Sequence, residues 1–132
     1  MRSLVFIVAT LAVLALSSCS TVESYMGTSG GAPTKVVDGV LSNSAGMTLY
    51  TFDKDAAASG KSVCNGQCAA LWPPLLAAAD AKAHGEYTII TRDDGAKQWA
   101  YKGKPLYLWV KDTKPGERSG DGFNNVWRVA RV

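Results

Sequence analysis

Hydrophobic and polar positions alternate in short runs along most of the chain, a pattern typical of β-strands. Two runs rich in Val, Leu and aromatic residues, 35–41 and 47–53, flank the turn-forming segment 42–46 and predict a β-hairpin. Alternation resumes over 87–92 and 98–101, on either side of an Asp-Gly turn signal, and 126–132 predicts a last strand. Pro105 suits the first residue of a further strand, where no ladder hydrogen bond is lost. The pattern predicts a mainly β, antiparallel domain.

Two short segments between these strand groups favour helices. Residues 67–71 are one, and residues 75–83, rich in Leu and Ala and ending before Gly85, are the other. Pro73 and Pro74 must separate them, because proline interrupts a helix. We therefore expect one or two short helices between the two groups of strands.

The pattern Leu-Tyr-x-aromatic-x-Lys-Asp occurs twice, at 49–55 and at 106–112, and predicts two similar repeats, about 35–76 and 87–132, in a single domain at 35–132. In each copy the Tyr and the second aromatic residue share one face of a strand, and the Asp falls at its end. In one interpretation the aromatic residues form the core and the Asp residues anchor turns. In the other, these residues line a shared acidic site: Tyr50, Phe52, Asp55, Tyr107, Trp109 and Asp112.

The N-terminal residues predict export. Arg2 precedes an apolar run at 4–16, which is shorter than the roughly 20 residues of a membrane span, so residues 1–18 are expected to be a signal peptide. Leu16-Ser17-Ser18-Cys19 resembles the lipobox of bacterial lipoproteins, and the resemblance implies that acylated Cys19 holds the protein in a lipid bilayer. The alternative is an ordinary secretory signal that happens to carry a cysteine. Residues 19–34, rich in Gly, Ser and Thr, are expected to be a flexible tether.

The same resemblance gives an expected location. In lipoproteins of bacteria with two membranes, a residue other than Asp after the acylated cysteine implies transfer to the outer membrane, and Ser20 occupies that position here. We therefore expect a cell-envelope protein, on the periplasmic face of the outer membrane if the host has two membranes.

Charge and motifs narrow the functional classes. Beyond residue 18 the chain has 13 basic and 11 acidic residues, scattered among each other, so no nucleic-acid partner is predicted. No Gly-x-Ser-x-Gly elbow, zinc-type His pair or phosphate-cradling glycine loop is present in a suitable context, which makes an enzyme the least supported class. The loop at 112–125 does not follow the EF-hand pattern, and its Lys114 and Arg118 would oppose calcium.

Cys64 and Cys68 remain once Cys19 is assigned to the lipid. In an oxidising compartment an even number of cysteines predicts one disulfide. The alternative is a copper or thiol-redox site, because thiolates select Cu(I) and His84, the only histidine, offers an imidazole. The disulfide interpretation predicts no cofactor, and copper stays the alternative.

From about Val37 onward the chain resembles a bacterial family of predicted lipoproteins with a Tyr-x-(Phe/Trp/Tyr)-x-x-Asp motif, also described as a secreted repeat of unknown function. The resemblance rests on both Tyr-x-aromatic motifs, the Cys64 to Pro74 segment, Asp94-Gly95 with Gln98-Trp99-x-Tyr101, Gly103 to Tyr107, and Asp121-Gly122 before Trp127. It implies a small exported domain without an agreed activity.

Together these features predict a lipid-anchored envelope protein that acts as a non-enzymatic binding or structural module. Its protein or small-molecule partner is not named by the sequence. Aromatic surface for such a partner would come from those of three residues that are not buried, Tyr101, Tyr107 and Trp109.

Overall fold

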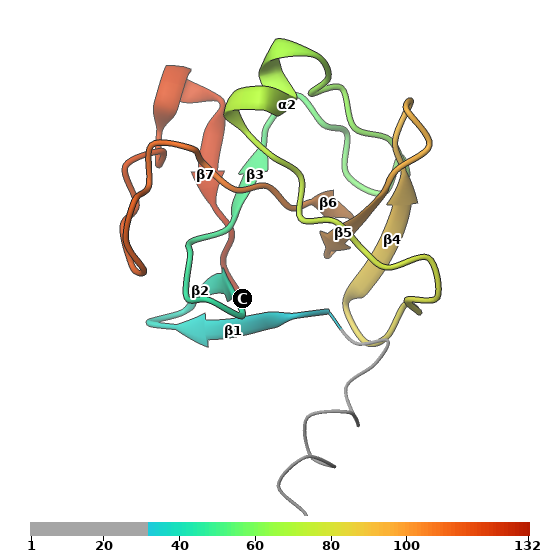
Figure 1. Cartoon of the computed structure of the whole chain (residues 1–132), viewed down its shortest axis with the longest axis horizontal. Coiled ribbons are helices and arrows are strands. Elements are labelled where there is room, and N and C mark those ends of the chain that lie inside the picture. The colour runs from blue at the N-terminus through green and yellow to red at the C-terminus, as the bar shows by residue number, and fades with distance from the viewer. Residues whose placement is uncertain (1–31) are drawn as a thin grey trace, which may run out of the picture.

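Three small antiparallel sheets and little helix make up the computed structural model, which describes residues 32–132 (Figure 1). The predicted mainly β architecture is therefore confirmed. The predicted signal peptide at 1–18, Cys19 and most of the predicted tether lie outside the described residues. In the described part, no helix has the length and apolar character needed to cross a membrane.

The first sheet is a hairpin of β1 (Thr34–Val37) and β2 (Val40–Asn43). Asp38 and Gly39 form its two-residue turn with φ angles of 51° and 74°, which are the positive values that such hairpin turns require. The expectation of one continuous strand over 35–41 was wrong, because this Asp-Gly turn divides it. Pairing across 42–46 nevertheless occurs as an isolated bridge between Ser42 and Thr48.

The third sheet contains β4 (Tyr87–Thr91), β5 (Lys97–Tyr101) and β6 (Lys104–Pro105), in that order. The predicted strands at 87–92 and 98–101 are confirmed to within a residue, with Ile89 opposite Trp99. Lys102 and Gly103, both at positive φ, turn the chain from β5 into β6. A Cβ on Gly103 would lie 2.8 Å from the backbone nitrogen of Ala58, so only glycine fits at this contact.

One of the two expected helices forms. The helix α2 (Gln67–Leu71) matches the prediction, but residues 75–83 are not helical. The Leu75 N–H donates to the Leu106 carbonyl and the Leu75 carbonyl accepts from Trp99, both at 2.9 Å, so this segment lies extended beside β5. Burial of Leu75 against a sheet outweighs the helix propensity of the sequence around it. A short 3-10 helix, η2 (Phe123–Asn125), precedes the last strand.

The two halves of the domain exchange their strands. In the second sheet, β3 (Tyr50–Phe52) from the first half pairs with β7 (Trp127–Val129) from the end of the second half. The reciprocal pairing also exists, because the Leu108 N–H donates to the Pro73 carbonyl at 2.7 Å. Each motif strand therefore needs the end of the other half to complete its ladder.

The two motif strands also meet each other. Tyr50 and Tyr107 exchange two backbone hydrogen bonds, of 2.8 and 2.9 Å, and form a bridge between the halves. The buried core divides into two clusters beside this bridge. The first is mainly aromatic and contains Val40, Tyr50, Phe52, Cys64, Trp72, Tyr107, Trp109, Trp127 and Val129. The second is mainly aliphatic and contains Leu41, Leu49, Leu75, Trp99, Leu106 and Ala130.

Candidate functional site

The two repeat motifs bond to each other through their side chains. The Tyr50 hydroxyl donates to the Asp112 carboxylate at 2.5 Å, and the Tyr107 hydroxyl donates to the Asp55 carboxylate. All four side chains are buried. Each tyrosine of one repeat is therefore bound by the aspartate of the other repeat, and the two motifs form one polar centre in the core.

The second oxygen of each aspartate holds a loop of its own half. Asp112 Oδ1 accepts the Ser119 backbone N–H at 3.0 Å and the Ser119 hydroxyl at 2.5 Å. Asp55 Oδ1 accepts the Val63 N–H at 2.7 Å. The aspartates therefore anchor turns, as the first interpretation of the motif predicted. They also link the two repeats, which that interpretation did not predict.

Four aromatic rings stack across the interface between the halves. Phe52 stacks on Trp127 with ring centroids 4.3 Å apart, and Trp72 stacks on Trp109 at 4.0 Å. The two tryptophans at the centre, Trp72 and Trp127, are 3.8 Å apart. The order Phe52, Trp127, Trp72, Trp109 alternates between the two halves. Trp72 and Trp127 entered the sequence analysis only through the family resemblance, because nothing in the local pattern shows that distant tryptophans will stack.

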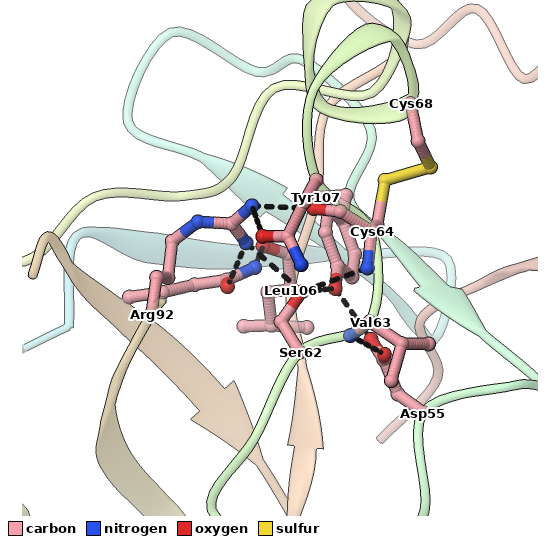
Figure 2. The surroundings of a disulfide bond; sticks show 10 residues. Asp55, Ser62, Val63, Cys64, Cys68, Arg92, Leu106 and Tyr107 are labelled. Carbon is pink, nitrogen blue, oxygen red and sulfur yellow. Dashed lines mark hydrogen bonds between the residues drawn. A yellow bond between two sulfur atoms is a disulfide. The ribbon is translucent and has the colours of Figure 1, made fainter. Parts of the chain in front are cut away.

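A buried arginine, which the sequence analysis did not single out, supports the first half of this centre (Figure 2). Arg92 donates through Nη1 to the Ser62 hydroxyl at 3.0 Å and to Gln98 Oε1 at 2.7 Å, and through Nη2 to the Cys64 carbonyl at 2.5 Å. Arginine is rarely buried unless its donors are satisfied, and here the acceptors come from two separate segments, residues 62–64 and β5. Its place at the end of β4 gives no sequence signal of this role.

A chain of hydrogen bonds runs from Arg92 to Asp55, and each group in it donates to the next. Ser62 Oγ accepts from Arg92 and from the Cys64 N–H at 3.2 Å, so its own hydrogen points to the Tyr107 hydroxyl 2.6 Å away. Tyr107 then donates to Asp55. The chain from cation to carboxylate passes through two hydroxyl groups. In the other half the Gly120 N–H takes the position of the serine and donates to the Tyr50 hydroxyl at 3.2 Å.

Burial is the largest influence on the pKa values of Asp55, Tyr50 and Tyr107 in this centre. It raises the pKa of Asp55, against the opposing effects of the Tyr107 hydroxyl, the Val63 N–H and the Arg92 charge. Burial, reinforced by the aspartate that each one binds, also raises the pKa of Tyr50 and of Tyr107. Both tyrosines therefore remain protonated donors, which is the state that the two crossed hydrogen bonds need.

The expected disulfide is present between Cys64 and Cys68 (Figure 2). It links the first turn of α2 to the segment whose Cys64 carbonyl binds Arg92. The short disulfide loop therefore fixes an acceptor of the buried arginine. Gly66 inside the loop has a φ of 57°, which favours glycine at that position.

His84 packs in a different part of the domain from the Cys64–Cys68 pair. Its ring is 5.4 Å from that of Tyr87 and 6.0 Å from that of Trp99, and its Nε2 accepts the Ala32 N–H at 3.0 Å. Trp99 belongs to the aliphatic cluster, whereas Cys64 belongs to the aromatic one. Among residues 32–132, no three His, Cys, Asp or Glu side chains are grouped as a metal ion would require.

Two of the three residues considered for an aromatic surface are buried. Tyr107 is fully buried and Trp109 is 6% exposed, because both pack in the aromatic cluster. Tyr101 is half-buried, and its ring has the Lys102 ammonium group 5.4 Å above it.

The fold and the crossed motifs define a two-repeat β module whose halves complete each other. A family described as a secreted repeat of unknown function matches the chain twice, over residues 34–76 and 88–131, and the chain belongs to this family. That description fits an extracellular or cell-envelope location. Comparisons with curated proteins and with solved structures gave no match.

Proposed function

We propose that this protein is a lipid-anchored lipoprotein of the cell envelope whose two-repeat domain acts as a non-enzymatic binding or structural module. One observation carries the second part of this proposal. The polar groups of the repeat motif are buried and bonded to each other, and no buried side-chain nitrogen or oxygen in residues 32–132 lacks a hydrogen-bond partner. Acid–base or nucleophilic catalysis needs such groups within reach of a substrate, whereas here they hold the two halves together.

The support for anchoring comes from the sequence. The apolar run at 4–16 ends in Leu16-Ser17-Ser18-Cys19, and acylation of Cys19 would bury several acyl chains, each methylene contributing about 0.8 kcal/mol of membrane affinity. The family description of a secreted repeat agrees with export. The lipid bilayer would then be the first partner of the protein, reached through the acyl chains of Cys19.

Metabolic labelling tests the anchor. Cells that express the wild-type chain are fed an alkyne-tagged palmitate, and the protein is followed in membrane and soluble fractions. We expect labelled, membrane-bound wild-type protein and an unlabelled Cys19→Ser variant. The matched control is the Cys64→Ser/Cys68→Ser double variant, which removes the other two cysteines and should keep its label. A Cys19→Ser variant that remains labelled in the membrane fraction would reject the proposal.

The outer-membrane assignment has a separate test. In a host with two membranes, inner and outer membranes are separated by density, and the wild type is expected in the outer fraction. Replacing the residue after the acylated cysteine, Ser20→Asp, should shift the protein to the inner fraction without loss of label. Equal distribution of both proteins would contradict an outer-membrane location determined by Ser20.

A further inference from the structure

A groove of about 380 Å³ lies over the outer face of the β3–β7 sheet. Its floor is formed by Thr51 and by Val129 and Ala130, all three of which are buried. Tyr101, Lys102 and Lys104, at the turn between β5 and β6, also line it. The volume lies within the range of about 300–1,000 Å³ that small-molecule sites occupy.

Basic side chains surround this groove, namely Lys102, Lys104, Arg128 and Arg131, with Asp121 as the one acidic residue. Residues 32–132 contain 13 Lys and Arg against 10 Asp and Glu, since Arg2 and Glu23 of the 14 and 11 in the whole sequence precede them. Outside the groove nine residues of each sign remain. The whole excess of positive charge in the described chain therefore lines this one groove.

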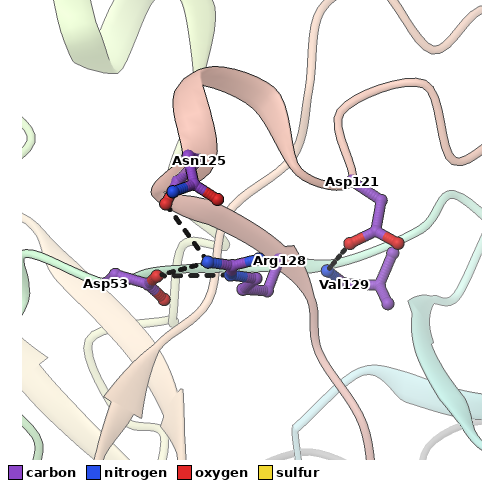
Figure 3. Close-up of polar contacts among 5 residues, drawn as sticks. All are labelled: Asp53, Asp121, Asn125, Arg128 and Val129. Atoms are coloured by element: carbon purple, nitrogen blue, oxygen red, sulfur yellow. Dashed lines mark hydrogen bonds and ion pairs between the residues drawn. The ribbon is translucent and has the colours of Figure 1, made fainter.

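Most of this charge has no internal partner. The one ion pair within residues 32–132 joins Arg128 to Asp53 at 3.1 Å, and Arg128 also donates to the Asn125 carbonyl at 3.1 Å (Figure 3). Asp121 accepts the Val129 N–H at 3.2 Å, so its carboxylate is used to hold the loop against β7 (Figure 3). The charges of the two lysines and of Arg131 are left without a carboxylate within ion-pair distance.

The floor offers a hydrogen-bonding group as well. Thr51 is only 9% exposed, and its hydroxyl has no hydrogen-bond partner among the described residues. Every fully buried side-chain oxygen of these residues has a partner, so the Thr51 hydroxyl is accessible from the groove, where it can bond to water or to a ligand. The groove therefore combines unpaired positive charge with a polar floor.

The fold does not require these charges, as the other half of the domain shows. The Tyr50–Val129 pair corresponds by register to the Tyr107–Pro74 bridge. Counting along the strands from these pairs, the positions that match Thr51, Arg128 and Arg131 are Leu108, Pro73 and Leu76. The equivalent surface is thus built from apolar residues, and the basic groove is a property of one half only.

We propose that this groove binds a phosphate-bearing anion. Lysine ammonium groups and arginine guanidinium groups are the usual protein ligands of phosphate, and an excess of three positive charges in the groove favours an anionic ligand. The phosphate belongs either to a soluble compound or to a lipid headgroup at the membrane. This inference rests on the proposed binding function and gives it a ligand class, but it is independent of the Cys19 anchor.

Calorimetric titration of the mature full-length protein in non-ionic detergent tests the proposal with two probes. Inorganic pyrophosphate represents a soluble phosphate compound, and glycerophosphoglycerol represents the headgroup of an anionic lipid. We expect saturable binding of one probe per chain. Tighter binding of pyrophosphate assigns the site to soluble phosphates, and tighter binding of glycerophosphoglycerol assigns it to the headgroup. Absence of saturable binding by both probes overturns the proposal.

Two variants show whether binding occurs in the groove. Lys102→Gln/Lys104→Gln/Arg131→Gln should weaken binding by about tenfold or more for each cation removed. The matched control is a triple variant at exposed lysines outside the groove, Lys61→Gln/Lys82→Gln/Lys114→Gln, which loses the same charge and should bind as the wild type does. Equal weakening in both triple variants would mean general charge attraction and would reject the site.

A variant of the floor keeps the test valid if the triple variant does not fold. Thr51→Val preserves the β-branched shape of the side chain and the net charge, and removes only the hydroxyl. We expect several-fold weaker binding with an unchanged unfolding transition. Binding at wild-type strength would reject the groove floor as part of the site, and would overturn the proposal in the form given above. Failure here leaves the labelling result for Cys19 unaffected, so the two proposals are distinguishable.

Discussion

Trp72 and Trp127 stack face to face at the centre of the domain, with ring centroids 3.8 Å apart and an angle of 4° between their planes. Each is also nearly perpendicular to a motif tyrosine, with ring centroids 5.3 Å apart for Tyr50 and Trp72 and 5.1 Å apart for Tyr107 and Trp127. The two halves therefore meet in a nearly symmetric way. Neither half holds a complete core alone, because the rings that cover each tryptophan come from both halves.

The crossed hydrogen bonds can be measured by double-mutant cycles. Tyr107→Phe is expected to lower the free energy of unfolding by about 2 kcal/mol, because the buried Asp55 carboxylate loses a donor. Combined with Asp55→Asn the losses should be non-additive, whereas Tyr107→Phe with Asp112→Asn should add to within about 0.5 kcal/mol. Urea unfolding followed by tryptophan fluorescence measures both. Stronger coupling within a repeat than between repeats would contradict the crossed arrangement.

Stability should depend on pH through Asp55. Burial raises the pKa of Asp55 above its ordinary value of 3.8, so between that value and the raised pKa the native protein binds more protons than the unfolded chain does. The stability that Asp55 contributes is therefore fully present below pH 3.8 and is lost as the pH rises through the raised pKa. Relative to Asp55→Asn, the unfolding free energy of the wild type should fall as the pH rises from 3.8 through the raised pKa. Urea unfolding across this range measures it, and a rising difference would contradict it.

Removing Arg92 should be among the most damaging single changes. Arg92→Met leaves acceptors at Ser62, Gln98 and the Cys64 carbonyl unpaired in the core, and we expect a loss of about 3–5 kcal/mol. Arg118→Met, a control at an exposed position, should change stability by no more than about 0.5 kcal/mol. Chemical denaturation of the three proteins measures the difference. Equal stability of the two variants would mean that the buried network contributes nothing.

Gly120 tests the packing of the tryptophan stack. A Cβ at this position would lie 2.6 Å from Cη2 of Trp72 and 3.1 Å from Cδ1 of Trp109. Gly120→Ala should therefore cost about 1–3 kcal/mol by overpacking and should change the tryptophan fluorescence of the native protein. Gly116→Ala is the control, because its φ of 85° strains alanine while no atom lies within 4 Å of the added Cβ. That variant should leave the fluorescence unchanged, and identical spectra of both variants would contradict the contact.

The cysteine pair can be tested for structure and for copper in one experiment. Replacing both residues, Cys64→Ser/Cys68→Ser, should cost about 2 kcal/mol, as expected when a short loop is opened. Reduced wild-type protein is then titrated with Cu(I). The disulfide interpretation predicts no specific binding beyond that of the double serine variant. Stoichiometric Cu(I) binding that the variant loses would favour the copper alternative instead.

Local chemistry accounts for what the sequence determined by itself. Alternation of apolar and polar residues predicted β4 and β5, and the Asp-Gly pair predicted the turn between them. The doubled motif predicted two repeats. Each of these signals lies within a few consecutive residues. The disulfide also belongs here, since Cys64 and Cys68 are close in sequence and an exported chain meets oxidising conditions.

Tertiary structure alone decided how the repeats meet. Residues 75–83 have a helix-forming composition, yet Leu75 lies beside β5, because its burial there outweighs the helix propensity of the segment. The exchange that joins Tyr107 to Asp55, the burial of Arg92 and the gathering of cations over β7 all connect residues far apart in sequence. No local sequence pattern encodes such contacts, because they form only when segments far apart in the sequence pack together in the folded chain.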